Sequence, residues 1–92
     1  MRRIIVSRHP AAVEFIRRER PEFREAPVVE TATPRDVRRA EVAGNLPLHL
    51  AALACKVIAV EFPSAPPRGN EYTLSQMEVA GAYLAEYRVT RL

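Results

Sequence analysis

The apolar residues of the chain occur in two patterns: uninterrupted runs, and sets of residues that recur at helical spacing. The two clear runs are Ile4 to Val6 and Val57 to Val60. A short continuous apolar run is typical of a strand covered on both faces. The pattern therefore predicts buried strands over residues 2–7 and 56–62, and weaker strands over residues 27–31 and 41–44.

Between these segments the apolar residues recur at helical spacing, and capping residues mark where the helices begin. Pro10 suits the first turn of a helix, Thr33-Pro34 reads as an N-cap and first helical position, and Thr73 to Gln76 forms a capping box. These signals predict helices over residues 11–20, 35–40, 46–55 and 74 to about 87 or 88.

Strands and helices thus alternate four times within the 92 residues. Short strand–helix–strand crossovers produce parallel, right-handed, doubly wound sheets. We expect one α/β domain spanning residues 1–92, with a mainly parallel sheet of about four strands flanked by helices. A core of this size is modest, so a dimer interface would supplement it.

Composition narrows the classes of protein further. Hydrophobic residues make up 48% of the chain and charged residues 27%, which is typical of a globular domain. No apolar run reaches the ~20 residues of a membrane span, and the start of the chain has no signal-peptide core. One cysteine allows no intrachain disulfide, which fits a reducing compartment. We expect a cytoplasmic protein with no membrane partner.

The charge balance favours a compact anionic ligand. The net charge is +3, and every basic residue except Lys56 is an arginine. This excess is too small to predict binding to duplex DNA, but guanidinium groups suit phosphate groups. Solvated helix faces are an equally good reading of the same bias.

In open α/β sheets, ligands bind beyond the carboxyl ends of the strands. The first such place holds Ser7, Arg8, His9 and Pro10, where a hydroxyl, a guanidinium, an imidazole and helix N-terminal amides would converge on a phosphate. The alternative is a surface ion pair for Arg8 and a capping role for His9.

Two further places follow the later strands. The third predicted strand ends in Gly44, Asn45, Leu46 and Pro47, with His49 on the next helical turn. Gly44 would let a ligand approach the backbone and Asn45 would bind it, although a cap explains Asn45 equally well. In the last loop Arg68 could reach phosphate and Tyr72 could stack on a base, with Glu71 beside them; the alternative is an ordinary surface loop.

The familiar cofactor motifs are missing from the sequence. It contains no G-x-G-x-x-G, no Walker loop and no G-x-S-x-G. Two histidines, one cysteine and one aspartate offer no zinc-ligand spacing. We expect neither a cofactor nor a metal ion.

Four segments in order resemble one known family. They are V-S-R-H-P-A-A-V-E-F at 6–15, A-G-N-L-P-L-H-L-A-A at 43–52, R-G-N-E-Y-T at 68–73, and A-x-Y-x-V at 85–89. Together they resemble the small accessory proteins of type III CRISPR systems in the ring-nuclease group. The resemblance implies a Rossmann-like, CARF-related homodimer. It also implies binding and cleavage of cyclic oligoadenylate, most often the four-adenosine ring, which switches off signalling.

The resemblance also suggests a mechanism without metal. Attack of a ribose 2′-OH on the adjacent phosphodiester leaves a 2′,3′-cyclic phosphate and a 5′-OH. Arg8 and Arg68 would hold the phosphate charge, Ser7 and Asn45 would orient it, and His9 would protonate the leaving oxygen. His49 and Glu71 are reserve candidates for that acid.

Three other readings remain open from the sequence. The protein could bind the messenger without cutting it. It could be a phosphomonoesterase built on Arg8-His9, although Pro10 stands where a glycine is usual. It could also be a protein-interaction domain without a ligand.

Overall fold

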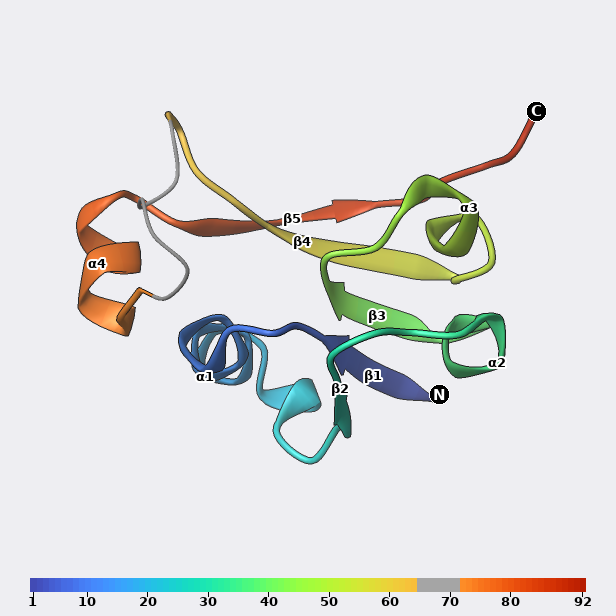
Figure 1. The fold of residues 1–92 in the computed structure, drawn as a ribbon, viewed down its shortest axis with the longest axis horizontal. Helices are drawn as coiled ribbons and strands as arrows, with labels where there is room; N and C mark the ends of the chain where they lie inside the picture. Colours follow the sequence, from blue (N-terminus) through green and yellow to red (C-terminus); the bar gives the residue numbers. More distant parts are fainter. Residues whose placement is uncertain (65–71) are drawn as a thin grey trace.

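The protein is described here by a computed structural model that covers residues 1–64 and 72–92. Within these residues five strands form one sheet in the order β2-β1-β3-β4-β5 (Figure 1). The strands are β1 (Arg3–Val6), β2 (Val28–Val29), β3 (Glu41–Gly44), β4 (Lys56–Glu61) and β5 (Tyr83–Tyr87). Strands β1 to β4 are parallel, and β5 runs antiparallel to β4.

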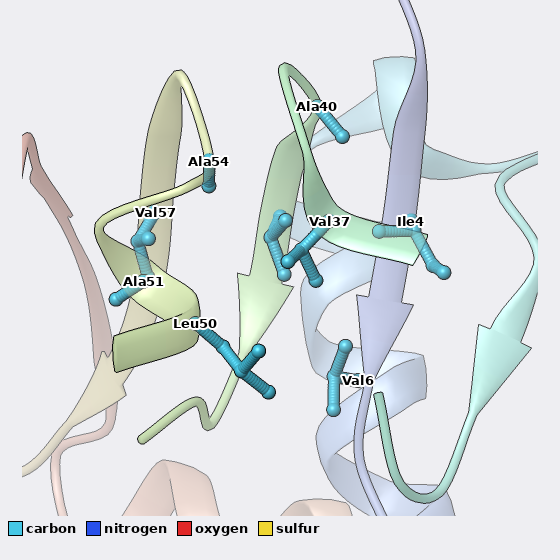
Figure 2. Close-up of a cluster of buried hydrophobic side chains, with 9 residues drawn as sticks. Ile4, Val6, Val37, Ala40, Leu50, Ala51, Ala54 and Val57 are labelled. Atoms are coloured by element: carbon cyan, nitrogen blue, oxygen red, sulfur yellow. The ribbon is translucent and has the colours of Figure 1, made fainter. Parts of the chain in front are cut away.

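Helices cover both faces of the sheet. They are α1 (Pro10–Glu19), α2 (Pro34–Val37), α3 (Leu48–Ala51) and α4 (Leu74–Val79), with a 3₁₀ turn, η1, at Pro21–Phe23. Figure 2 shows the face beneath α2 and α3, where Ile4, Val6 and Val57 pack against Val37 and Leu50. The opposite face carries Ile5, Ala43 and Ile58, which pack against Ile16 of α1 and Phe23 of η1.

Because neighbouring residues of a strand point to opposite faces, a strand with two covered faces needs an unbroken apolar run. This is why Ile4-Ile5-Val6 is buried throughout. The mainly parallel α/β sheet is confirmed, and the strand at 41–44 has the predicted bounds. The capping box predicted from Thr73 to Gln76 is present. Thr33 is the N-cap of α2 as predicted, and it also forms a capping box with Asp36.

The prediction of one long final helix was wrong. Helix α4 ends at Val79, and residues 83–87 form a fifth strand where helix was expected. Gly81, placed on the predicted helical seam, has a φ of +81° and ends the helix instead. The amide of Gly81 donates to the carbonyl of Glu78, and that of Ala82 to the carbonyl of Met77. These two bonds make a Schellman motif, which turns the chain back along β4.

The third helix is also shorter than predicted, at four residues in place of residues 46–55. The apolar stripe predicted for it comprises Leu46, Leu50, Leu53 and Ala54. Leu50 and Ala54 are buried in the core, and the other two are partly buried against it. Turns follow Ala51, however, and the amide of Ala54 donates to the carbonyl of Ala51. Burial of the stripe therefore does not require a continuous helix.

Gly44 allows β1 and β3 to meet at their carboxyl ends. Its φ is +123°, and a Cβ added there would lie 1.9 Å from the carbonyl oxygen of Val6. The next amide, of Asn45, donates to that same oxygen at 3.1 Å. A glycine is therefore needed here for the approach of two protein strands, whatever else binds nearby.

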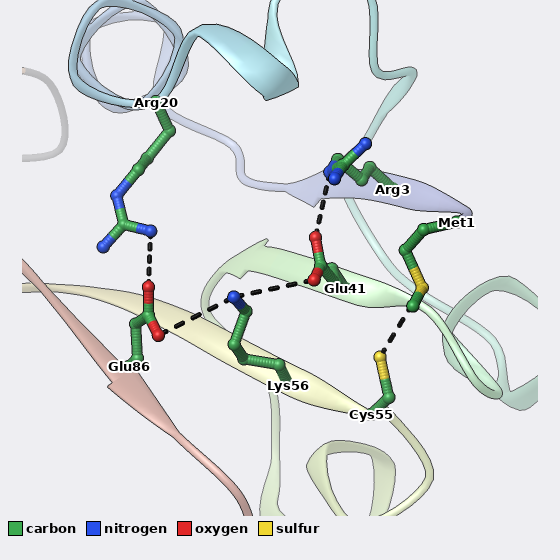
Figure 3. A network of polar contacts seen from close by, with 7 residues as sticks. All are labelled: Met1, Arg3, Arg20, Glu41, Cys55, Lys56 and Glu86. Carbon is green, nitrogen blue, oxygen red and sulfur yellow. Dashed lines mark hydrogen bonds and ion pairs between the residues drawn. The ribbon is translucent and has the colours of Figure 1, made fainter.

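At the opposite end of the sheet an ion-pair network crosses the strands (Figure 3). Glu41 on β3 pairs with Arg3 at 2.9 Å and with Lys56 at 3.5 Å. Lys56 also pairs with Glu86 on β5 at 3.6 Å, and Glu86 accepts from Arg20 at 2.5 Å. The network thus connects β1, β3, β4 and β5 to the segment that follows α1.

Candidate functional site

The strand order reverses between β1 and β3. From β1 the chain crosses to β2 on one side, whereas β3, β4 and β5 follow on the other. In open α/β sheets such a reversal leaves a crevice beyond the carboxyl ends of the two central strands. A pocket of about 570 Å³ lies there. Its lining comprises Val6, Ser7, Arg8, His9, Ala12, Gly44, Asn45, Val60, Phe62 and Tyr72.

The segment after β1 opens helix α1 without a side-chain cap. His9 occupies the N-cap position, but its side chain accepts no bond from the first turn. Ser7 instead turns the chain, because its Oγ accepts the amide of His9 at 3.1 Å. Since Pro10 has no N–H, the uncapped amides of the first turn are those of Ala11 and Ala12. Ala12 lines the pocket, so this turn presents its positive end there.

His9 forms a stacked aromatic pair with Tyr72 in the pocket lining. Their ring centroids are 4.8 Å apart and the planes differ by 25°, so the two rings stack. The Nδ1 atom of His9 is buried and has no hydrogen-bond partner among the described residues. Burial raises the pKa of the Tyr72 hydroxyl, so it stays protonated at neutral pH. The pair fixes the position of an imidazole whose hydrogen-bonding capacity is not fully used.

Arg8 is exposed at the rim of the pocket. Its guanidinium donates to the hydroxyl of Thr31, at 3.3 Å, just beyond the carboxyl end of β2. No ion pair to Arg8 occurs within the described part of the chain. The guanidinium is therefore held by a neutral partner, with its charge available to an anion.

Asn45 completes this side of the pocket. Its backbone amide is bonded to Val6, while its side chain is exposed and lines the pocket. It does not cap α3, because the N-cap of that helix is Pro47, which makes no side-chain bond. The amide side chain is thus available to a ligand.

The structure therefore brings together Ser7, Arg8, His9, Gly44, Asn45 and Tyr72 from three separate segments. Four other predicted residues lie off the pocket lining: Pro10, Leu46, Pro47 and His49. Pro10 is the first residue of α1, and His49 is exposed on α3. Arg68 and Glu71 lie outside the described residues.

Four lining residues were not predicted as site residues: Val6, Ala12, Val60 and Phe62. Val60 lies in β4 near its carboxyl end, and Phe62 directly follows that strand. The rule that selected Ser7 and Gly44 also applies to these two, but their apolar side chains carried no chemical signal. They supply the apolar wall that a ligand pocket needs.

Among residues 1–64 and 72–92, no group of three or more His, Cys, Asp or Glu side chains is placed to hold a metal ion. No helix in this part of the chain has the length and apolar character to cross a membrane.

The fold and pocket define a small α/β protein with an open, mostly parallel sheet and a ligand-sized pocket at the reversal of strand order. Residues 4–90 match the model of the family described as "Putative CRISPR-associated protein (Cas_VVA1548)". This match covers nearly the whole chain, and the protein belongs to that family. Searches of curated proteins and of solved structures gave no match.

Proposed function

We propose that the protein is a Rossmann-like, CARF-related ring nuclease of type III CRISPR systems that binds and cleaves cyclic oligoadenylate in this pocket. The observation that carries the proposal is the uncapped start of α1, which opens into the pocket beside Arg8. Helices α2 and α4 by contrast have their first turns closed by capping boxes, and α3, which also lacks a side-chain cap, lies off the pocket lining. An uncapped helix start next to an arginine without an acidic partner suits a phosphodiester.

The aromatic side chains that form one wall of the pocket support the proposal that the ligand is a nucleotide. Tyr72 stacks on His9, and Phe62 lines the same pocket. Aromatic rings of this kind bind bases through their faces, without dependence on hydrogen-bond readout. An adenine on this wall would place its phosphate near the start of α1. The family membership is consistent with a ligand used in CRISPR signalling.

The proposed chemistry needs no group beyond the chain and its ligand. The ribose 2′-oxygen forms a bond to phosphorus, the bond from phosphorus to the 5′-oxygen breaks, and the products are a 2′,3′-cyclic phosphate and a 5′-OH. The proton lost by the 2′-OH leaves to solvent, His9 gives a proton to the 5′-oxygen, and solvent water then returns a proton to His9. Arg8 and the α1 amides stabilise the charge that builds on the phosphoryl oxygens.

The size of the pocket favours a dimer. Pockets of roughly 300–1,000 Å³ hold drug-sized molecules, and a ring of four nucleotides is larger than that. Two pockets related by a twofold axis would each take part of the ring and present His9 twice. In light scattering with ligand present we expect about twice the 10.4 kDa chain mass; a monomer at micromolar concentration would contradict this.

The decisive experiment is incubation with cyclic tri-, tetra- and hexa-adenylate in EDTA, followed by mass spectrometry. We expect linear products with 2′,3′-cyclic phosphate ends. Intact ligand recovered after denaturing the protein would instead identify a binding protein that sequesters the messenger. That alternative is favoured by one observation: the described pocket lining contains only one imidazole to move protons. Absence of any nucleotide-induced rise in melting temperature would contradict both functions.

Two variants separate binding from proton transfer. Arg8→Ala should weaken affinity roughly tenfold to a hundredfold, because a charge-assisted bond contributes about 1.5–3 kcal/mol. Arg24→Ala, an exposed arginine away from the pocket, is the matched control. His9→Ala should keep most affinity while single-turnover cleavage falls by about 10²–10⁴. If His49→Ala loses cleavage and His9→Ala does not, the acid is wrongly assigned.

A further inference from the structure

A second concave site lies at the other end of the sheet, and its lining is almost entirely arginine. A depression of about 710 Å³ is lined by Arg2, Pro34, Arg35, Arg38 and Arg39. Arg2 precedes β1, and the other residues belong to α2 and the turn before β3. The amino ends of β1 and β3 lie at this edge, opposite the pocket beside His9. All four arginines are exposed.

None of the four arginines of this cluster takes part in an ion pair within the described residues. The nearby carboxylate of Asp36 accepts the amide and hydroxyl of Thr33, at 2.8 and 3.0 Å. Both bonds end on Oδ2 in the capping box of α2. They lower the pKa of Asp36, and the charge of Arg2 lowers it further. Elsewhere in the fold, Arg3, Arg18 and Arg20 all have acidic partners.

The backbone holds the cluster in place. Arg2 donates to the carbonyls of Arg35, Asp36 and Arg38, at 3.2, 3.1 and 2.9 Å. These carbonyls lie in or just after α2, where the helix itself leaves them without partners. Arg39 adopts a left-handed φ of +59°, and its amide donates to Leu53. The side chains of Arg35, Arg38 and Arg39 make no hydrogen bond within the described chain, so they can engage a ligand.

We propose that this arginine cluster binds the phosphodiester backbone of a single-stranded nucleic acid, at a site distinct from the pocket beside His9. Phosphate contacts require cations and carry no base recognition, and the lining formed by the described residues contains no aromatic side chain that could stack on bases. A flexible strand can follow a concave surface, whereas duplex phosphates lie on a convex one. A protein partner is disfavoured because interface cores are rich in apolar residues, and no exposed large hydrophobic residue of the described chain lines the depression.

The test uses fluorescein-labelled dodecauridylate and fluorescence anisotropy between 25 and 200 mM salt. The triple variant Arg35→Ala, Arg38→Ala, Arg39→Ala should bind at least about tenfold more weakly than wild type at low salt. Its slope of log K against log salt should be smaller by about 2, because each lost phosphate contact removes about 0.7 from the slope. Thymidylate of the same length should behave in the same way, since the 2′-OH is not read.

The matched control removes the same charge elsewhere, by Arg24→Ala, Arg88→Ala, Arg91→Ala. All three residues are exposed and lie outside the depression. The control should keep wild-type affinity within about threefold, and thermal melts should show both triple variants folded. Three results would overturn the proposal: no binding by wild type at 25 mM salt, an equal loss in both triple variants, or an equal loss in Arg8→Ala. The uridylate strand contains no adenine ring, so these results are independent of those on cyclic oligoadenylate.

Discussion

At the scale of single residues, Ser7, Arg8, His9 and Asn45 lie together in one pocket, and each stands at or just after the end of a predicted strand. Their detailed roles depend on geometry that no spacing contains. Ser7 accepts the backbone amide of His9, and Arg8 reaches Thr31, a residue 23 positions away.

Gly44 is a residue whose identity is required by the packing of two strands. We expect Gly44→Ala to lower the free energy of unfolding by about 3 kcal/mol or more, because a methyl group cannot share space with the Val6 carbonyl. Urea denaturation of the purified variant measures this loss.

Gly81→Ala is the matched comparison. Its φ is also positive, but the nearest atoms to an added Cβ belong to the Pro63 side chain, at 3.2 and 3.3 Å. We expect a loss of about 1–2 kcal/mol, from the left-handed backbone alone. Equal losses in the two glycine variants would mean that the contact with Val6 is not what requires Gly44.

At the scale of elements, local signals predicted strands and helix starts well and the last element badly. Apolar runs identify β1 and β4 because both faces are covered, and Thr–Pro or Thr–x–x–Gln identifies the starts of α2 and α4. The region after α4 has apolar residues at both helical and alternating spacing, so periodicity could not decide. Gly81 determines that the helix ends before this region, because it forms a C-terminal cap that needs a left-handed backbone.

The two threonine caps allow the element next to the pocket to be tested. Thr33→Ala and Thr73→Ala each remove a capping box and should each lower unfolding free energy by about 1 kcal/mol. Thr73 adjoins Tyr72, which stacks on His9, whereas Thr33 lies outside the pocket lining. Only Thr73→Ala should also weaken binding of cyclic tetra-adenylate, by several-fold in calorimetric titration. Equal effects of both variants on binding would show that the start of α4 does not position the pocket.

At the scale of the whole molecule, the sequence predicted a parallel α/β sheet but not the order of its strands. Strand order depends on which strand pairs with which. The strands have similar Val-, Ile- and Ala-rich sequences, so nothing in a strand's own sequence specifies its neighbours in the sheet. The same limit applies to the network of Figure 3, which joins Arg3, Glu41, Lys56 and Glu86 from four different strands. Their sequence positions alone gave no reason to connect them.

This network predicts how stability depends on pH. The hydrogen bond from Arg20, and then the charge of Lys56, lower the pKa of Glu86 in the folded state. A lowered pKa stabilises the fold above the unfolded value of about 4.5, and this contribution is lost as the pH falls through the folded value. Melting curves of Glu86→Gln should therefore lie below those of wild type at neutral pH and approach them below pH 4.5.

The control for this comparison is Glu14→Gln, an exposed acid outside the network. Its melting temperature should follow that of wild type at every pH. A constant offset between Glu86→Gln and wild type from pH 7 to pH 3 would show that Glu86 acts through packing and not through its charge.

The reversed direction of β5 determines where other proteins can be attached to this one. Arg3 at the start of β1 is level with Glu41 and Lys56, and Tyr87 at the end of β5 pairs with Val57 on the same edge. The chain therefore enters and leaves through the edge of the sheet away from α1, as the N and C labels of Figure 1 show. A fluorescent protein or a surface tether joined to either terminus would leave the mouth of the pocket accessible. A fusion at the N-terminus, next to Arg2, would crowd the arginine-lined depression, so an N-terminal tag separates the two sites without any substitution.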